Sequence, residues 1–369
     1  MARAFDAEYR PKKLSDIIGQ EVATKILTNS FKAKKMHQAY IFAGNFGCGK
    51  TTAARVIAAM KNCKKGPTLE PCGVCTNCKA IFSGTSLDVK EIDAASNRSI
   101  DDIRELKLEI RHSPINCKER VVIIDEAHSL TGVAAESALK MIEEPPPNVT
   151  FILCTTDPHL LKETIHSRCI LLVFNKISWI DILQNLTDIC KKEKINFEED
   201  ALKIIAKSSR GSARNSLKNL EKVISFADEN QILTAADATK VLGAVDDNLY
   251  FHLIDSIIGT KAPKAMKVIN KILIDGKEIE QVIKGLVYHL RRLLIAKSCA
   301  DNLAEFDFSE DEIKRFSYQS GLLHTQQIID MIDLISEINK GISFSIDPQT
   351  LLEKFSIQAM FLKERYKTK

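Results

Sequence analysis

Apolar residues recur with two different periods along this chain. Within the first ~175 residues, short runs rich in β-branched residues alternate with stretches in which apolar residues stand three or four positions apart, as in parallel strands joined by crossover helices. The predicted strands are residues 37–44, 87–94, 119–128 and 149–156. The predicted helices are residues 21–35, 51–60, 100–112 and 132–144. The last of these must stop at Pro145, because proline has no N–H group to continue a helix.

From about Ser178 the strand pattern disappears and amphipathic helices follow one another. The shorter predicted helices are residues 179–194, 197–209, 212–227 and 235–243. The later ones include residues 249–258, 262–276, 279–299 and 325–342. The pattern therefore predicts an α/β domain with a parallel sheet at residues 1–177, a small helical domain at 178–242 and an all-helical domain at 243–369.

Composition agrees with a multi-domain globular protein. The 369 residues are 45% hydrophobic and 27% charged, which is ordinary for globular domains. The longest apolar runs are far shorter than the ~20 residues of a membrane span, and the charged N-terminus lacks a signal-peptide core. We therefore expect a cytoplasmic protein. The net charge of +4 permits a nucleic-acid partner without requiring one.

A glycine-rich loop follows the first predicted strand and opens a helix. Gly44, Gly49, Lys50 and Thr51 have the spacing G-x-x-x-x-G-K-T, in which backbone N–H groups and a helix N-terminus hold phosphates. Lys50 would neutralise the β and γ phosphates of ATP, and Thr51 would ligate Mg²⁺. Cys48 within the loop is interpreted as a small tolerated side chain rather than a redox group. The predicted nucleotide-binding residues of the loop are Gly44, Asn45, Gly47, Cys48, Gly49, Lys50, Thr51 and Thr52.

An acidic pair follows the strand at 119–128. Asp125 is placed to hold Mg²⁺ together with Thr51, and Glu126 to orient or deprotonate the attacking water. His128 completes the letters DEAH, which occur in some helicases but also fit other ATPases of this general fold.

Four of the ten cysteines are clustered. Cys63, Cys72, Cys75 and Cys78 have the spacing C-x8-C-x2-C-x2-C, which suits a tetrahedral structural Zn²⁺ site. Two disulfides or an iron–sulfur cluster are the competing interpretations. The other six cysteines are isolated and are expected to be small core or surface residues.

The roles of three further residues stay open on the residues alone. Thr155 and Thr156 end the strand at 149–156, where a hydroxyl could contact phosphate or merely favour the strand. Arg214 begins a helix of the second domain and either folds back over the nucleotide or is a solvated surface residue.

Several segments taken together carry a resemblance. YRPKKLSDIIGQ at 9–20, the glycine-rich loop, the four cysteines, VVIIDEAHSL, TIHSRC at 164–169 and GSARNSLKNLEKV resemble the gamma/tau subunits of the bacterial DNA polymerase III clamp loader, which are AAA+ ATPases. The resemblance is dense over residues 5–225 and looser beyond.

The resemblance implies an AAA+ P-loop domain with a zinc-binding insertion at 63–78, a helical lid and a helical collar. The collar would join other clamp-loader subunits, including delta and delta prime types, into a pentameric ring. ATP binding would open the sliding clamp, and primer-template DNA would trigger hydrolysis and release. By matching of motifs, Thr156 is sensor 1, Arg214 is sensor 2, and Arg168 is the arginine finger that reaches the ATP of the neighbouring subunit. Arg10 is a weaker candidate nucleotide contact.

The chain departs from the family pattern in three places. Asn215 stands where the lid motif usually has Asp, and the loop before SRC lacks its usual proline; both are interpreted as drift. The chain also ends at Lys369 without the extension of tau-type subunits, which predicts a short gamma-type form, a truncated chain or a divergent loader.

Contacts with the DNA phosphate backbone are harder to place. The candidate segment is Asn97, Arg98 and Ser99 at the start of a helix. Its competing interpretation is a plain helix cap by Ser99 with Asp102.

Two other functions remain as alternatives to an ATP-hydrolysing loader subunit. One is a non-hydrolysing stator similar to delta prime, which the intact loop and acidic pair disfavour. The other is a hexameric helicase, which is disfavoured because no second motor domain is predicted.

Overall fold

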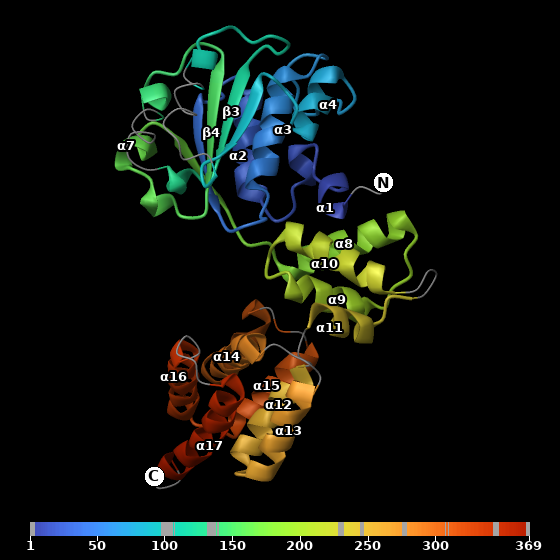
Figure 1. The fold of residues 1–369 in the computed structure, drawn as a ribbon, viewed down its shortest axis with the longest axis vertical. Helices are drawn as coiled ribbons and strands as arrows, with labels where there is room; N and C mark the ends of the chain where they lie inside the picture. The colour runs from blue at the N-terminus through green and yellow to red at the C-terminus, as the bar shows by residue number, and fades with distance from the viewer. Residues whose placement is uncertain are drawn as a thin grey trace. The chain divides into compact units, whose positions relative to one another are not determined.

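The structure, a computed structural model, describes residues 4–96, 106, 108–130, 138, 140–227, 232–243, 247–274, 279–306, 308, 310–341 and 347–366. The chain forms two compact units, Met1–Ala238 and Thr239–Lys369. The first contains a parallel sheet flanked by helices, and the described part of the second is helical (Figure 1). The predicted α/β class, followed by helical domains, is confirmed. The exact division into three domains stays a prediction.

The sheet of the first unit has five strands in the order β2-β3-β4-β1-β5, and each neighbouring pair is parallel. The strands are β1 (Ala39–Gly44), β2 (Val89–Asp93), β3 (Arg120–Asp125), β4 (Val149–Thr155) and β5 (Ile170–Phe174). Parallel strands bring their carboxyl ends to one edge of the sheet. The segments that follow β1, β3 and β4 therefore start side by side.

Four of these strands lie within the predicted ranges, whereas β5 was not predicted. Its five residues are all apolar, and a short apolar run does not by itself distinguish a strand from other buried structure. In the fold, β5 is an edge strand beside β1, and Leu171 and Val173 on one of its faces are exposed.

The described helices surround this sheet and fill the remainder of the chain. Those from the N-terminus to the last strand are α1 (Phe5–Glu8), η1 (Leu14–Asp16), α2 (Glu21–Lys32), α3 (Lys50–Asn62), α4 (Thr76–Ser83), η2 (Ala127–Ser129), η3 (Pro158–Leu160) and α7 (Glu163–His166). Those that follow are α8 (Trp179–Glu193), α9 (Glu199–Ser208), α10 (Ala213–Phe226), α11 (Ala235–Leu242), α12 (Asp247–Ile258), α13 (Ala262–Ile274), α14 (Ile279–Ser298), η4 (Ala300–Phe306), α15 (Glu310–Gly321), α16 (Thr325–Gly341) and α17 (Pro348–Tyr366). The helical residues 140–143 end before Pro145, as predicted.

Alternation along each strand builds a core on both faces of the sheet. Tyr40 and Phe42 of β1 join the cluster that contains the buried residues of α2, α3 and α4. Ile41 of β1 joins a separate cluster on the opposite face, which also contains Ile165 of α7. Helices α3 and α7 therefore lie on opposite faces of the sheet, as Figure 1 shows.

Helices α8, α9 and α10 pack together after β5. Each of them buries apolar side chains, among them Leu186 of α8, Leu202 of α9 and Leu220 of α10. The first of these helices is capped by Ser178, whose Oγ accepts a hydrogen bond from the N–H group of Asp181 at 3.0 Å. This cap fixes where the helix begins, directly after the linker from β5.

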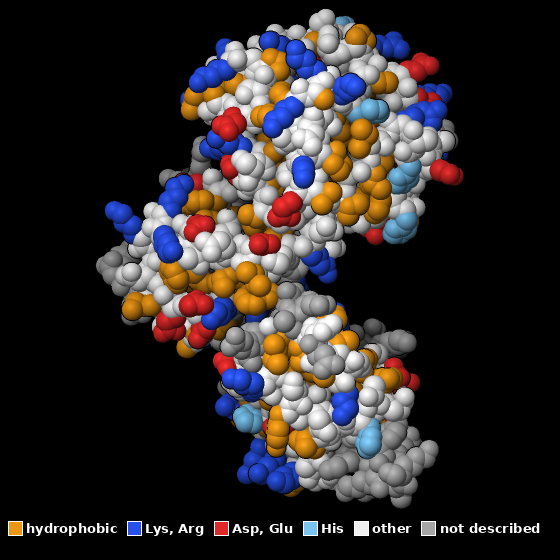
Figure 2. All heavy atoms as spheres, turned by 180° about the vertical axis from the view of Figure 1, so that it is seen from behind, with side chains coloured by type: hydrophobic (Ala, Val, Ile, Leu, Met, Phe, Trp, Pro, Cys, Tyr) orange, Lys and Arg blue, Asp and Glu red, His pale blue; other side chains and the backbone are white. Residues whose placement is uncertain are grey.

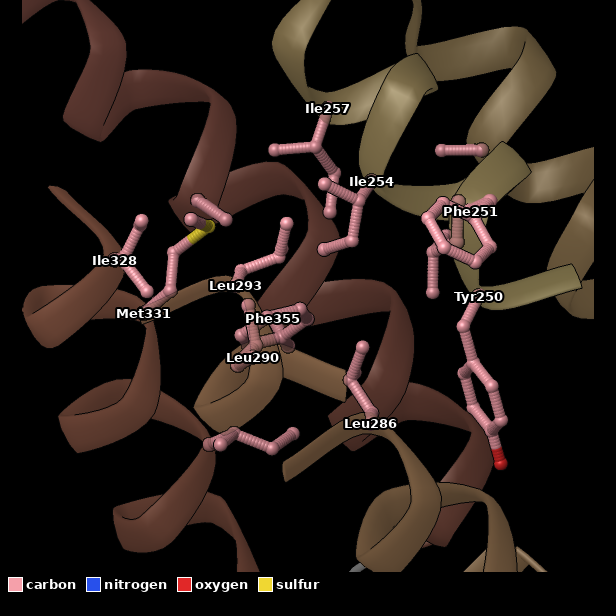
Figure 3. Packing of buried hydrophobic residues seen from close by; sticks show 14 of the residues in the cluster. Tyr250, Phe251, Ile254, Ile257, Leu286, Leu290, Leu293, Ile328, Met331 and Phe355 are labelled. Atoms are coloured by element: carbon pink, nitrogen blue, oxygen red, sulfur yellow. The ribbon is translucent and has the colours of Figure 1, made fainter. Parts of the chain in front are cut away.

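The second unit has its own hydrophobic core (Figure 3). Side chains that converge there include Ile254 and Ile257 of α12, Leu290 and Leu293 of α14, Met331 of α16 and Phe355 of α17. One buried polar network crosses this core: His289 Nε2 lies 2.9 Å from Gln319 Oε1, and Gln319 Nε2 donates to Asp255 at 2.7 Å. Burial lowers the pKa of His289 to about 4, so this histidine is neutral at pH 7 and the network carries no buried cation.

A buried carboxylate fixes the loop that leads into β3. Asp88 accepts hydrogen bonds from the N–H groups of Ile115, Asn116 and Cys117 at 2.7 to 2.8 Å. Arg120 at the start of β3 lies 3.6 Å from the same carboxylate. Burial acts to raise the pKa of Asp88, but the three N–H groups and Arg120 outweigh it, and the pKa is lowered.

Replacing Asp88 with Asn is expected to lower the free energy of unfolding by about 2–4 kcal/mol. The amide oxygen replaces only part of the acceptor capacity, and the substitution removes the charge that faces Arg120. Because folding lowers this pKa, the stabilisation is present above the unfolded-state value of about 3.9 and is lost as the pH falls through the folded-state value. Urea unfolding across pH would measure both effects.

The matched control is Asp200→Asn, which removes a carboxylate that pairs with Lys203 at 3.1 Å on an exposed helix face. An exposed pair of this kind adds little stability. Equal destabilisation in the two variants would contradict the role assigned to Asp88.

Candidate functional site

The glycine-rich loop joins the end of β1 to the start of α3. Gly49, the residue before α3, has a left-handed φ of 103°, so the chain turns there and directs the first N–H groups of the helix toward the loop. The side chain of Lys50 is buried, and its Nζ donates to the carbonyl oxygens of Gly44 at 2.7 Å and Asn45 at 2.9 Å. The loop therefore encloses its lysine at the N-terminus of α3.

The same loop touches the helices that follow the sheet. The N–H group of Ala213, at the start of α10, donates to the carbonyl oxygen of Gly47 at 3.1 Å. A Cβ atom on Gly47 would lie 2.1 Å from the Oγ atom of Ser212. Glycine is required at this position because of that close approach and its φ of 71°.

The acidic pair meets the loop from β3. Thr51 Oγ1 donates to Asp125 Oδ2 at 2.9 Å, so the two predicted magnesium ligands are adjacent. Glu126 follows with a left-handed φ of 48°. Burial, and then the charge of Asp125, raise the pKa of Glu126. A carboxylate with a raised pKa beside a phosphate loop is suited to accept a proton from water.

The end of β4 supplies the two threonines that remained open from the residues alone. Thr156 Oγ1 lies 3.4 Å from Glu126 Oε2 and donates to Asp157 Oδ2 at 2.6 Å. Thr155 is buried, and its hydroxyl lies 2.9 Å from His128 Nδ1. The geometry distinguishes them: Thr156 is beside the catalytic candidate Glu126, whereas Thr155 supports His128.

One cavity brings most of the predicted site residues together. Its lining includes Gly47, Cys48, Gly49, Lys50, Thr51, Thr52, Asp125, Glu126, Arg10 and Arg214. Arg214 on α10 forms an ion pair with Asp6 of α1 at 3.2 Å. Burial, and then the nearby charge of Arg55, lower the pKa of Arg10. Three predicted site residues do not line the cavity but contact residues that do. Gly44 and Asn45 contact Lys50, and Thr156 contacts Glu126.

Arg168 lies elsewhere. It follows α7 on the face of the sheet opposite α3, and the next residue, Cys169, packs against the core cluster of that face. Its guanidinium pairs with Glu143 at 3.4 Å and donates to the carbonyl oxygen of Thr164 at 3.1 Å, and the side chain is 42% exposed. Arg168 is therefore not part of the cavity formed by its own chain.

Two buried groups support the loop. Cys48 is 1% exposed, and its thiol donates to the carbonyl oxygen of Asn45 at 2.9 Å; burial raises its pKa, which favours packing over redox chemistry. Gln20 was not predicted as a site residue. Its amide donates to the carbonyl oxygens of Cys48 at 3.3 Å and Asn175 at 2.7 Å, and it accepts from Asn175 N at 2.9 Å.

Gln20 therefore joins the glycine-rich loop to the linker between β5 and α8. It is only 3% exposed. The available signal was a polar residue directly before an amphipathic helix, which resembles an ordinary helix start. The sequence does not show that the Gln20 side chain reaches Cys48 and Asn175, which are distant from it in the chain.

The four clustered cysteines meet as predicted. The sulfur atoms of Cys63, Cys72, Cys75 and Cys78 all lie within 4.8 Å of one another and are free thiols. The N–H groups of Val74 and Cys75 lower the pKa of Cys72 to about 6, whereas burial raises the pKa of Cys78. Four converging sulfurs suit a closed tetrahedral site.

The candidate DNA contacts at Asn97, Arg98 and Ser99 lie outside the described residues, as does Asp102. On the face drawn in Figure 2, the described Lys and Arg side chains are spread among neutral, acidic and hydrophobic ones. They form no continuous basic patch on the described part of this face. Among the described helices, none is both long and apolar enough to cross a membrane.

Three family models cover most of the chain. Residues 19–178 match a model described as DNA polymerase III, delta subunit. Residues 181–229 match the ATPase lid domain of DNA polymerase III clamp loader subunits, and residues 233–367 match domain III of the gamma and tau subunits.

Solved structures add little to these matches. The chain is similar to the Thermotoga maritima RuvB Holliday junction branch migration motor, with 21% identity and a TM-score of 0.48, over 68% of this chain and 79% of that one. A similarity at this level does not bear on the function.

Individual relatives agree with the family models. The chain is 34% identical to the tau subunit of Bacillus subtilis DNA polymerase III, over 94% of this chain and 61% of that protein. It is 35% identical to the gamma subunit of Buchnera aphidicola, over 86% of this chain and 88% of that protein. The chain thus spans about three fifths of the Bacillus relative and most of the shorter gamma subunit. These matches show that the chain belongs to the gamma/tau family of DNA polymerase III subunits.

Proposed function

We propose that the chain is the ATPase motor subunit of a DNA polymerase sliding-clamp loader. ATP binding would drive clamp opening, and hydrolysis on primer-template DNA would release the clamp. The observation that supports this proposal best is that the phosphate loop, the acidic pair and the lid arginine meet around one cavity. Membership of the gamma/tau family supports the same conclusion.

The loop binds the phosphates in this proposal. The N–H groups between Gly44 and Thr52 and the N-terminus of α3 face the phosphates, and Lys50 exchanges its carbonyl partners for the β and γ phosphate oxygens. Thr51 and Asp125 hold Mg²⁺, which when bound neutralises phosphate charge. Their 2.9 Å hydrogen bond supports this role because it places both oxygen ligands at one point.

Hydrolysis is assigned to groups at the ends of β3 and β4. Glu126 orients or deprotonates the attacking water, and its raised pKa supports that role. Thr156 acts as sensor 1 through its position 3.4 Å from Glu126. Arg214 from the lid acts as sensor 2, and Arg10 from the N-terminal segment also contacts the nucleotide.

Arg168 completes the site of a neighbouring subunit. Arg168 lies on the opposite face of the sheet from α3, and its side chain is exposed. This position supports action in trans, because the side chain can reach the cavity of another subunit but not the cavity of its own chain. Charge supplied in trans stabilises the transition state of phosphoryl transfer without occupying the resting site.

The assembly follows from the same proposal. Residues 1–177 form the nucleotide-binding domain, 178–242 the lid and 243–369 the collar. The collar contacts other loader subunits, of delta and delta prime types, in a pentameric ring. The ring acts on the sliding clamp and tracks primer-template DNA through its phosphates.

The four-cysteine cluster is proposed to hold structural zinc. Cys63 is the residue directly after α3, and Cys75 caps α4 by accepting from the N–H group of Cys78 at 3.4 Å. A metal bound to these sulfurs would join the ends of the two helices and hold the insertion as one module.

Glu126→Gln is expected to retain ATP binding and lower turnover by about 10²–10⁴-fold, because the amide does not accept a proton. In the unchanged chain the rate should fall on acidification at a pH above the ordinary glutamate pKa of 4.5, because the Glu126 pKa is raised. ATPase assays with clamp, partner subunits and primed DNA would measure both.

The exposed Glu144 offers a control, since Glu144→Gln should leave turnover nearly unchanged. Absence of turnover by the unchanged chain in every combination would support the stator similar to delta prime instead. Strand displacement without clamp loading would support a helicase.

Arg168→Ala is expected to leave ATP binding intact and to lower DNA-stimulated hydrolysis by about 10³-fold or more, as for arginines supplied in trans. The matched control is Arg111→Ala, an exposed arginine next to Ile110, which packs in the core of the same sheet face. Normal hydrolysis by an isolated monomer, together with no effect of Arg168→Ala, would contradict action in trans.

Cys72→Ser is expected to abolish binding of one zinc ion per chain and to lower the melting temperature by about 5–10 °C. The nearby Cys117, which lies outside the four-sulfur cluster, is the control, and Cys117→Ser should retain the metal. Metal analysis and thermal unfolding would test this. Full zinc content in Cys72→Ser, or an iron–sulfur absorbance spectrum, would contradict the zinc assignment.

A further inference from the structure

One acidic side chain from the N-terminal segment lies in the candidate nucleotide cavity and pairs with the lid arginine. Asp6 belongs to α1, lines the cavity and lies 3.2 Å from Arg214 Nε. Its side chain is 13% exposed, against 52% for Arg214. The carboxylate is therefore largely enclosed, whereas much of the arginine remains accessible from the cavity.

A carboxylate is unfavourable in a cavity that binds phosphates. Like charges within a few ångströms repel, and the repulsion is stronger where little water separates them. Arg214 is the group that the proposed function assigns to the phosphates from the lid side. Asp6 and the nucleotide therefore require the same guanidinium.

The contact also connects the N-terminal segment to the lid. Helix α1 packs against α10. Three residues after Asp6, the Tyr9 hydroxyl donates to the Glu193 carboxylate, and Lys192 Nζ lies 5.0 Å from the centroid of the Tyr9 ring. Burial, and then the hydrogen bond to Glu193, raise the pKa of Tyr9 to about 12, so the phenol keeps the proton that it donates.

The segment is thus attached to α8 through Tyr9 and to α10 through Asp6. The two attachments differ in one respect. The Tyr9 attachment uses groups that have no assigned role toward phosphate, whereas the Asp6 attachment uses Arg214. Nucleotide binding would therefore act on the second attachment directly.

We propose that Asp6 is a specificity-determining residue of the nucleotide site, which competes with the terminal phosphate of ATP for Arg214. ATP binding breaks the Asp6–Arg214 pair, whereas ADP, which lacks that phosphate, leaves the pair intact. The inference rests on the proposed function, because it takes ATP as the ligand and Arg214 as a contact of its terminal phosphate. After hydrolysis and release of the terminal phosphate, the Asp6–Arg214 pair forms again.

Calorimetric titration of the full chain with Mg²⁺ and either a non-hydrolysable ATP analogue or ADP tests the proposal. Asp6→Asn, which keeps the size of the side chain, is expected to tighten binding of the analogue about fivefold, the factor that corresponds to one ion pair of this exposure. Its effect on ADP should stay below about twofold. Asp6→Ala should behave in the same way, and Asp6→Glu should restore the original affinities.

Two comparisons separate competition from a general charge effect. Glu8→Gln removes the same charge from the same helix beside the same cavity. This substitution should change the affinities for the ATP analogue and for ADP by one common factor. In the Arg214→Ala background, Asp6→Asn should change the affinity for the analogue no more than the affinity for ADP, because only the direct charge effect of Asp6 remains.

The inference is overturned if Asp6→Asn raises the affinity for the ATP analogue equally with and without Arg214. It is also overturned if Asp6→Asn raises the affinity for ADP as much as the affinity for the analogue. A change of equal size in Glu8→Gln, restricted to the analogue, would also overturn it. If the unchanged chain binds neither nucleotide, the proposed function itself fails, which is a distinguishable result.

Discussion

The hydrogen bond from Thr51 to Asp125 joins residues that are 74 positions apart in the chain. It forms because β4 alone separates β1 from β3, and because α3 covers this part of the sheet. The parallel arrangement brings the carboxyl ends of these strands to one edge. With that constraint in place, the loop after β1, the acids after β3 and the threonine after β4 become neighbours. Their proximity depends on the strand order.

The loop depends equally on segments outside the sheet. Gly47 accepts a hydrogen bond from Ala213 of α10, and Gln20 connects Cys48 to the linker at Asn175. Phosphate binding at the loop would therefore act on the position of the lid through short, direct contacts. Such coupling is what a motor requires, because a ligand shifts a conformation only through contacts that differ between the two states.

Helix α3 also connects the loop to the cysteine cluster. Lys50 begins the helix and Cys63 follows its last residue, so the glycine-rich loop and the candidate zinc module lie at its two ends. Asn62 near that end accepts hydrogen bonds from the N–H groups of Lys118 and Glu119 at 3.0 and 2.9 Å. The cluster and the Asp88 network together hold the base of the sheet, away from the candidate nucleotide cavity.

Much of this organisation could be predicted without a structure. Residues close together in the sequence identify the glycine-rich loop, the acidic pair and the four cysteines. Four strands are recognisable as apolar runs between segments with helical periodicity. Strand β5 was missed because its five residues are all apolar and show no alternation of apolar and polar positions. Gln20 was missed because its partners, Cys48 and Asn175, are distant in the chain.

The sequence by itself determined which groups are present: the loop that encloses Lys50, the Asp125–Glu126 pair, the four thiols and Arg168. Only the tertiary structure decided which of them share a site. It placed Arg214 beside Asp6, Thr156 rather than Thr155 beside Glu126, and Arg168 on the far face of the sheet. The physical reason is that side-chain distances across a sheet depend on strand order and on which face each residue occupies, and neither is encoded in local spacing.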